Sequence, residues 1–264
     1  MPGFKGQGSM AAWLAAVAAV AFSFTAPVAP PPKPPAPPGQ PICISRAGYT
    51  DCIPAAWNGY RIFLSVACHD RGTGSCHENP GCDGFGENAN SLAIARTLTF
   101  VGTAEQPSLV QRGYAVRIGT GFTRDNIVNS NGYLVDRAHS LHVPIHSNAA
   151  GADACGSLDG GTELLFNGAD SRAAAEAVLA ALGPASPGSG DRLGERPDLA
   201  ELNATTAVSA YIEAEYHTWP TGVAWLKDPA TWAWRISDGI DACFGTPRAE
   251  TGRSTTATCR WSAG

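Results

Sequence analysis

The sequence is poor in charged residues and has no excess of basic ones. Its 264 residues include 18 Lys and Arg against 23 Asp and Glu, which gives a net charge of −5. A nucleic-acid-binding protein needs a basic face to replace the counterions of the phosphates. We therefore expect no nucleic-acid partner. The hydrophobic content of 44% suffices for a full core, and one large folded domain is the default expectation.

The amino-terminal region has an apolar segment, but not one of membrane-spanning length. Residues 10–22 (MAAWLAAVAAVAF) are shorter than the roughly 20 apolar residues that a spanning helix needs. Lys5 is the only charge among residues 1–29, and small residues follow the apolar segment. This pattern predicts a signal peptide over 1–29, and hence a protein that is secreted or held in the cell wall, without an integral membrane domain. A retained anchor on the outer face of the membrane is the alternative.

The chain also lacks internal repeats and a glycine-rich phosphate loop of the Rossmann or Walker type. Nine of the twenty prolines lie in residues 26–41, so residues 30–42 are expected to be an extended linker. Folding is expected to begin near Cys43 and to involve residues 43–264, with a core at about 58–245.

Apolar runs of strand length alternate with stretches of helical spacing. The expected strands are 62–67, 114–118, 141–146, 162–166 and 210–216, and the expected helices are 88–101, 127–140, 172–182 and 229–243. Residues 186–197 read as a surface loop. This alternation predicts an α/β fold with a doubly wound, mostly parallel sheet flanked by helices.

Eight cysteines in a chain with an export signal predict up to four disulfides. Proximity along the chain favours Cys43–Cys52 and Cys76–Cys82 as short loops, together with Cys68–Cys155 and Cys243–Cys259. Free or metal-bound thiols are the alternative, and Cys68 directly precedes His69, so a thiolate ligand at Cys68 remains open.

Metal-ligating residues occur where predicted strands end and where a predicted helix begins. His69 and His146 follow strands, and Glu87 stands at the start of a helix. Ligands in an open α/β sheet bind at the carboxyl ends of its strands. Two imidazoles and one carboxylate are a common zinc ligand set that leaves a position for water. His142 shares a strand face with His146 and is expected to lie behind the metal ligands or to be structural; an approach to the metal itself is the alternative.

Two glutamates interrupt the apolar segment 211–217 (YIEAEYH). Burying a carboxylate costs several kcal/mol unless it is paired or lies near a metal. Alternation along a strand places Glu213 and Glu215 on one face, so spacing alone does not choose between them. An exposed edge strand is the alternative.

Taken together, these segments resemble the zinc-dependent N-acetylmuramoyl-L-alanine amidases of the amidase-3 type, in an actinobacterial or actinophage branch. The resemblance rests on 63–90 (FLSVACHDRGTGSCHENPGCDGFGENAN), Thr123-Arg124-Asp125, 145–149 (IHSNA) and 210–217 (AYIEAEYH), and spans about residues 58–245. It implies a twisted sheet of about six strands, one Zn²⁺ per chain, and hydrolysis of the amide between N-acetylmuramic acid and L-alanine in peptidoglycan by a monomer.

The resemblance also implies roles for individual residues. His69, Glu87 and His146 fall on the zinc ligands, and Glu213 falls on the catalytic glutamate, with Glu215 as the possible alternative. Arg124, Asn148 and His217 are candidate substrate contacts. The rival functions are a secreted zinc peptidase that cuts wall peptides, and a wall-binding protein that has lost catalysis.

The disulfide prediction is tested by counting thiols under denaturing conditions. We expect no reactive thiol without reductant and eight after reduction, since all eight cysteines are assigned to disulfides. Several free thiols before reduction would contradict the assignment.

Overall fold

The computed structural model describes residues 39–77, 81–103, 105–150, 155–156, 160–246, 259 and 261. The predicted signal segment 1–29 and most of the predicted linker 30–42 lie outside these residues. Within the part of the chain that is described, no helix is long and apolar enough to cross a membrane.

The strands belong to one large sheet and one small one. The large sheet contains β1 (Ile42–Arg46), β2 (Tyr49–Ile53), β3 (Arg61–Val66), β6 (Ala115–Gly119), β7 (Ser140–Asn148), β8 (Glu163–Phe166), β9 (Arg192–Glu195), β10 (Val208–Ser209) and β11 (Tyr211–Tyr216). The small sheet pairs β4 (His69–Asp70) with β5 (Cys76–His77). The large sheet has the order β1-β2-β6-β3-β7-β11-β8-β9, and β10 also pairs with β7. Its central strands β6, β3, β7 and β11 are parallel.

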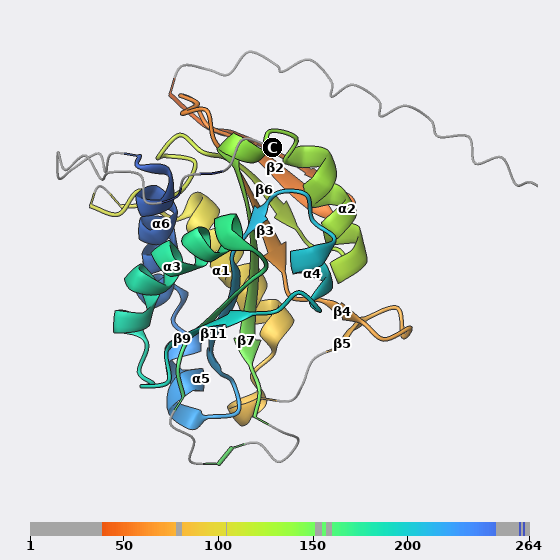
Figure 1. Cartoon of the computed structure of the whole chain (residues 1–264), viewed down its shortest axis with the longest axis vertical. Coiled ribbons are helices and arrows are strands. Elements are labelled where there is room, and N and C mark those ends of the chain that lie inside the picture. The colour runs from red at the N-terminus through yellow and green to blue at the C-terminus, as the bar shows by residue number, and fades with distance from the viewer. Residues whose placement is uncertain are drawn as a thin grey trace, which may run out of the picture. The chain divides into compact units, whose positions relative to one another are not determined.

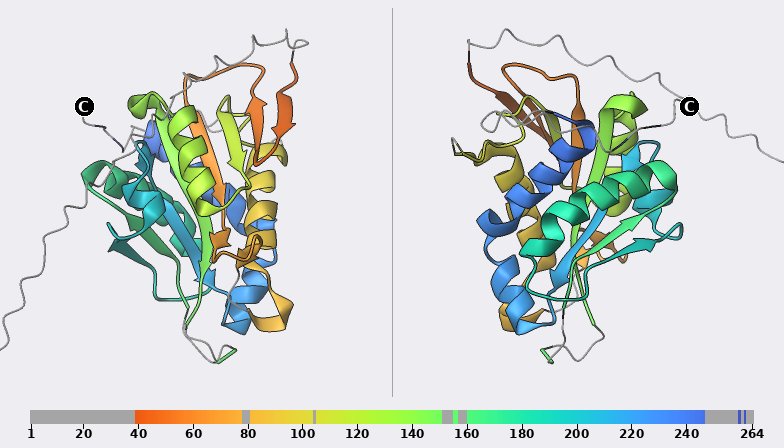
Figure 2. Two further views of the ribbon diagram at one scale, coloured as in Figure 1. Left: turned by 90° about the vertical axis from the view of Figure 1, so that its right-hand side faces the viewer. Right: turned by 60° about the vertical axis from the view of Figure 1, so that its left-hand side comes forward.

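Helices cover both faces of the large sheet (Figures 1 and 2). The α-helices are α1 (Glu87–Phe100), α2 (Thr123–Tyr133), α3 (Ala169–Leu182), α4 (Ala200–Asn203), α5 (Pro220–Leu226) and α6 (Pro229–Phe244), and the 3-10 helices are η1 (Cys82–Gly84), η2 (Arg137–His139) and η3 (Gly183–Ala185). α6 packs against α1 and α3 on one face, whereas α2 and α4 pack together on the other. The predicted α/β class, with a mostly parallel sheet between helices, is confirmed.

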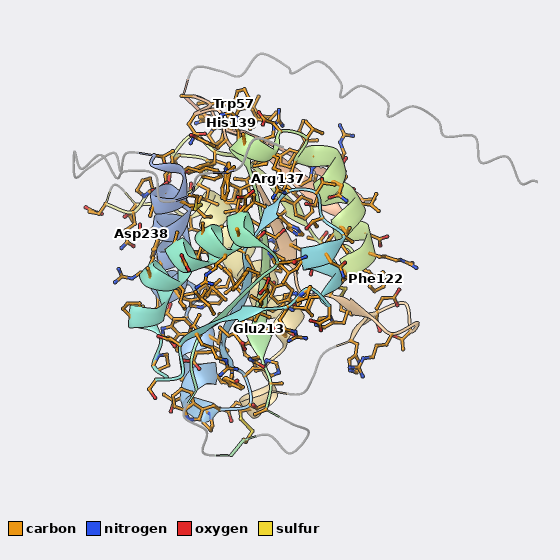
Figure 3. The ribbon with its side chains drawn as sticks, in the orientation of Figure 1. Trp57, Phe122, Arg137, His139, Glu213 and Asp238 are labelled. Atoms are coloured by element: carbon orange, nitrogen blue, oxygen red, sulfur yellow. A yellow bond between two sulfur atoms is a disulfide. The ribbon has the colours of Figure 1, made fainter. Side chains whose placement is uncertain are left out.

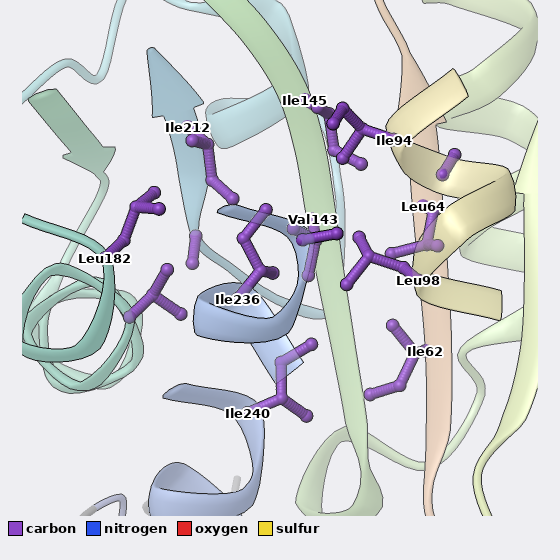
Figure 4. Packing of buried hydrophobic residues seen from close by; sticks show 14 of the residues in the cluster. Ile62, Leu64, Ile94, Leu98, Val143, Ile145, Leu182, Ile212, Ile236 and Ile240 are labelled. Atoms are coloured by element: carbon purple, nitrogen blue, oxygen red, sulfur yellow. The ribbon is translucent and has the colours of Figure 1, made fainter. Parts of the chain in front are cut away.

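The alternation of side chains along β7 separates an apolar core from a polar layer. Leu141, Val143 and Ile145 are fully buried in the main hydrophobic cluster. Figure 4 shows Val143 and Ile145 between α1 and α6. His142 and His146 point to the opposite face, because successive strand residues alternate. There the ring of His142 meets Phe63 edge-on at 5.3 Å. One strand thus supplies both part of the apolar core and two of the buried imidazoles, His142 and His146.

The large sheet has more strands than the sequence predicts. β1 and β2 form an antiparallel hairpin at one edge, and β9 pairs with β8 at the other. β9 lies within the expected surface loop 186–197, so that expectation is wrong. The segment becomes a strand because it pairs with the free edge of β8. Such a contact with a distant segment does not show as a periodic pattern in the residues of β9 itself.

The helix expected over 127–140 is also misplaced. α2 begins earlier, at Thr123, and ends at Tyr133, and β7 already starts at Ser140. Thr123–Asp125 form its first turn, where the carboxylate of Asp125 favours a helix amino terminus. Asp136 then begins the short 3-10 helix η2, because its carboxylate accepts a hydrogen bond from the N–H of Ala138.

Two of the four expected disulfides are correct, and the two near the strand ends are not. Cys43–Cys52 and Cys243–Cys259 are present, but Cys68 pairs with Cys76 and Cys82 pairs with Cys155. Cys68 therefore cannot act as a thiolate ligand. The β4–β5 hairpin brings Cys76 back beside Cys68. The N–H groups of Cys82 and Cys155 donate to the carbonyls of His217 and Thr218, which places these two cysteines together.

A matched pair of valine substitutions tests the assignment of the core. Val143 is fully buried in the main cluster, whereas Val128 on α2 is 71% exposed. We expect Val143→Ala to lower the free energy of unfolding by roughly 1.5–3 kcal/mol, through lost burial and a residual cavity. Val128→Ala should change it by less than about 0.5 kcal/mol. Urea unfolding with the disulfides intact gives both values, and equal effects would contradict this core.

Candidate metal and catalytic site

The three residues expected to bind metal meet at the carboxyl end of the parallel strands. His69 lies on β4 just after β3, His146 lies near the end of β7, and Glu87 is the first residue of α1. β3 and β7 are direct neighbours in parallel register, with Val66 opposite Ile145. Parallel pairing brings the ends of two strands to one edge, so the two histidines approach although 77 positions separate them in the sequence.

Two side chains of α1 fasten the helix to these strand ends. The hydroxyl of Ser91 donates to the carbonyl of Ile145 (2.7 Å) and accepts from the N–H of Ala67 (3.0 Å). The amide of Asn88 donates to the carbonyl of Ala67 (2.7 Å). Because both strands are held by the first turns of α1, Glu87 is fixed beside the two imidazoles.

The ligand atoms of His69, Glu87 and His146 all lie within 4.8 Å of one another. His146 Nδ1 lies 3.1 Å from Glu87 Oε1, which also accepts a hydrogen bond from the N–H of Ser147 (3.1 Å). His69 Nε2 lies 4.0 Å from Glu87 Oε2. Metal–ligand bonds of about 2.0–2.2 Å in a tetrahedral zinc site put ligand atoms roughly 3.4 Å apart. The cluster therefore fits a metal ion in both donor type and spacing.

The surroundings of His146 favour a positive charge at this point. Burial alone lowers its pKa, but Glu201 and Glu87 on its two sides outweigh burial and raise the pKa to about 10. Burial likewise raises the pKa of Glu87, yet its contacts with His146 bring that pKa below the ordinary value. A dication bound by these side chains takes the place of the imidazole proton.

Glu213, labelled in Figure 3, lies on β11. It is in register with His146 on β7 and with Glu163 on β8. It is partly buried, and its Oε2 atom is hidden from solvent and has no hydrogen-bond partner among the described residues. Burial raises the pKa of this carboxyl to about 8, and the neighbouring Glu87 adds to the rise. A carboxyl with a pKa near neutrality suits proton transfer at physiological pH.

Glu215 has different surroundings, although strand alternation predicts that it shares a face with Glu213. The register of β11 against β7 shifts between Glu213 and Tyr216. The fully buried carboxylate of Glu215 accepts hydrogen bonds from the N–H groups of Gly161 (2.9 Å) and Gly188 (2.9 Å) and from the hydroxyl of Ser186. Its oxygens are thus occupied in holding two loops together.

The three expected substrate contacts lie around this site in different settings. Arg124 is 75% exposed on α2 and lies 3.8 Å from Asp70, the residue after His69. The amide of Asn148 lies 3.4 Å from Glu163 Oε2. His217 is buried, with Nδ1 2.9 Å from the hydroxyl of Ser147 and its ring stacked on Phe85 at 5.6 Å.

One buried carboxylate of the site is absent from the predictions made on the sequence. Glu201 on α4 is 3% exposed and lies 3.6 Å from His146 Nε2 and 3.5 Å from His142 Nε2. Burial raises its pKa, but the two histidines overcome this and lower it to about 2. α4 has only four residues, too few for a periodic pattern that would predict the burial of Glu201. The one indication in the sequence is an acidic residue between Ala200 and Leu202.

Neither family models nor curated protein sequences give a match to this chain, whereas solved structures do. A catalytic domain of an N-acetylmuramoyl-L-alanine amidase from Bacillus (Paenibacillus) polymyxa var. colistinus is 19% identical, with a TM-score of 0.56 over 71% of this chain and 99% of that one. An N-acetylmuramoyl-L-alanine amidase from Clostridium difficile 630 is 17% identical, with a TM-score of 0.56 over 69% and 95%. An N-acetylmuramyl-L-alanine amidase from Mycobacterium smegmatis is 18% identical, with a TM-score of 0.53 over 70% of this chain and 96% of that one.

These structures share their fold with this chain, which confirms the fold expected from the sequence resemblance. Because the match covers 95–99% of each of these three chains, the parallel sheet and its helices correspond as a whole and not as a fragment.

The charge balance of the site is tested by counting protons released on metal binding. We expect zinc addition to the metal-free protein at pH 7 to release between about one and two protons, because His146 must lose one and the dication lowers the pKa of Glu213 from about 8. Calorimetry in buffers of different ionisation enthalpy measures this number. Glu213→Gln should reduce it to about one, and no release would contradict the site.

Proposed function

We propose that this protein is a peptidoglycan hydrolase that cleaves the amide bond between N-acetylmuramic acid and the L-alanine of the stem peptide. The observation that carries the proposal is the His69, Glu87 and His146 cluster beside Glu213, one of whose carboxyl oxygens is hidden from solvent. It lies at the strand ends of a fold shared with solved N-acetylmuramoyl-L-alanine amidases. The folded unit from about Cys43 onward would be the catalytic domain, and the protein would act as a monomer.

His69, Glu87 and His146 would hold one Zn²⁺. Zinc in such a site supplies Lewis acidity, which polarises a carbonyl group and acidifies water. The side chain of His69 is 44% exposed, so a substrate would approach the ion from the side of His69. This donor set favours zinc over the oxygen-ligated cations magnesium and calcium.

Glu213 would be the general base and then the general acid. As a carboxylate it takes a proton from the attacking water, and as a carboxylic acid it returns that proton to the leaving nitrogen of L-alanine. A pKa of about 8 in the metal-free protein keeps the two forms close in free energy, and a nearby dication lowers this value. Glu215 is less suited to the role because its oxygens already bind loop N–H groups.

Peptidoglycan would reach the site across the rim formed by β4, β11 and the start of α2. Arg124 at this rim is exposed and would bind a stem-peptide carboxylate, and Asn148 would contact the peptide near Glu163. We leave His217 out of this set because it is buried against Phe85. Action on peptidoglycan agrees with the expected location, secreted or at the cell wall, or else anchored outside the membrane.

Digestion of isolated cell walls tests the reaction. We expect intact stem peptides with free L-alanine amines in the mass spectrum, activity lost with a chelator, and activity restored by zinc. Cleavage between peptide residues would instead indicate a zinc peptidase. Wall binding without turnover would indicate a binding protein.

Substitutions of Glu213 and His146 test their assigned roles in proton transfer and metal binding. Glu213→Gln should keep zinc and lower turnover by roughly 10²–10⁴-fold, since it removes only proton transfer. His146→Ala should lose both zinc and turnover. Glu176→Gln on the exposed face of α3 is the matched control and should change neither. Full activity of Glu213→Gln would discard this scheme or move the role to Glu215.

A further inference from the structure

A buried carboxylate stands directly behind one of the metal-ligand residues. Glu201 is 3% exposed and belongs to α4, which covers the polar face of the sheet together with α2. An ionised carboxylate in such a place is costly unless charged or hydrogen-bonding groups surround it. The groups in contact with Glu201 must therefore offset the cost of burying its charge.

Three side chains from β3 and β7 surround Glu201. The hydroxyl of Ser65 donates a hydrogen bond to Oε1, and His142 Nε2 lies 3.5 Å from the same oxygen. His146 Nε2 lies 3.6 Å from Oε2. Ser65 is itself held by the amide of Asn126, which donates to its oxygen at 2.9 Å. The carboxylate is thus fixed from one side and turned toward His146 on the other.

The ring of His146 lies between two carboxylates. Its Nδ1 is 3.1 Å from Glu87 Oε1, and its Nε2 is 3.6 Å from Glu201 Oε2. A neutral imidazole binds a metal through one nitrogen and carries its proton on the other. A carboxylate at the protonated nitrogen fixes both the tautomer and the ring orientation, and makes the imidazole a stronger ligand.

We propose that Glu201 is a positioning residue, which holds His146 as the Nε2–H tautomer and so directs Nδ1 to an ion shared with Glu87 and His69. This inference rests on the metal site of the proposed function. His142 lies behind the same carboxylate, and its ring nitrogens have no hydrogen-bond partner in the described part of the chain. It would serve as a buried neighbour that holds Glu201 in place rather than as a ligand.

Zinc affinity of Glu201→Gln tests the proposal, measured by competition with a chromophoric chelator. The glutamine keeps the shape of the side chain but replaces a carboxylate by a weaker acceptor. We expect affinity to fall by roughly 10–100-fold. In the zinc-loaded wild type, ¹⁵N spectra of histidine should show His146 protonated at Nε2, and Co²⁺-substituted Glu201→Gln should show shifted visible absorption bands.

Two further variants separate this role from a merely structural one. Asp241→Asn also neutralises a buried carboxylate, which pairs with Arg112 and lies on α6, across the sheet from α4. It should lower stability while leaving zinc affinity unchanged. Ser65→Ala keeps the Glu201 carboxylate but removes its donor, and should weaken zinc binding by a smaller factor. If Glu201→Gln does not fold, Ser65→Ala alone decides.

The outcomes distinguish this inference from the proposed function. Zinc affinity and Co²⁺ spectra equal to those of the wild type would overturn the role of Glu201 alone. A wild-type protein that binds no zinc would overturn the metal site and this inference together. A wild type that binds zinc but does not cleave walls would overturn only the proposed reaction.

Discussion

The structure depends on the parallel pairing of β3 and β7 and on the helix that is fastened across their ends. Without that pairing, His69 and His146 would not share an edge of the sheet. The hydroxyl of Ser91 satisfies one backbone group from each side, the N–H of Ala67 and the carbonyl of Ile145. Buried backbone groups must find partners, and here the partner belongs to the helix that carries Glu87. The hydrogen bonds that Ser91 makes with these backbone groups therefore also fix Glu87 beside the two histidines.

The electrostatics of the site follow from where each carboxyl lies relative to His146. Glu201 and Glu213 are both surrounded by protein, yet contact with two imidazoles lowers the pKa of Glu201 to about 2, whereas burial without such pairing raises that of Glu213 to about 8. The same residue type is thus ionised at neutral pH in one place and largely protonated in the other. The neighbouring groups, and not burial alone, decide the protonation state.

Much of the fold was predictable because apolar runs and helical spacing report burial directly. β3, β7 and α6 lie within a residue or two of their expected positions. β9, α4 and the pairing of Cys82 with Cys155 were not predictable, because each depends on contacts with distant segments. For the site, the three expected metal-ligand residues do meet in space, but Glu201 gave no signal. Its carboxylate can be buried because His142 and His146 of β7 lie beside it, a contact that only the folded structure reveals.

The unequal exposure of the three clustered residues has a kinetic consequence. Glu87 and His146 are enclosed by α1, β7 and α4, while the side chain of His69 is 44% exposed on a two-stranded hairpin. An ion held by these three side chains would therefore be most open to solvent on the side of His69. Under the proposed function, a polymer strand bound across β4 would cover that side, so metal exchange would slow while the strand is bound and resume after its release.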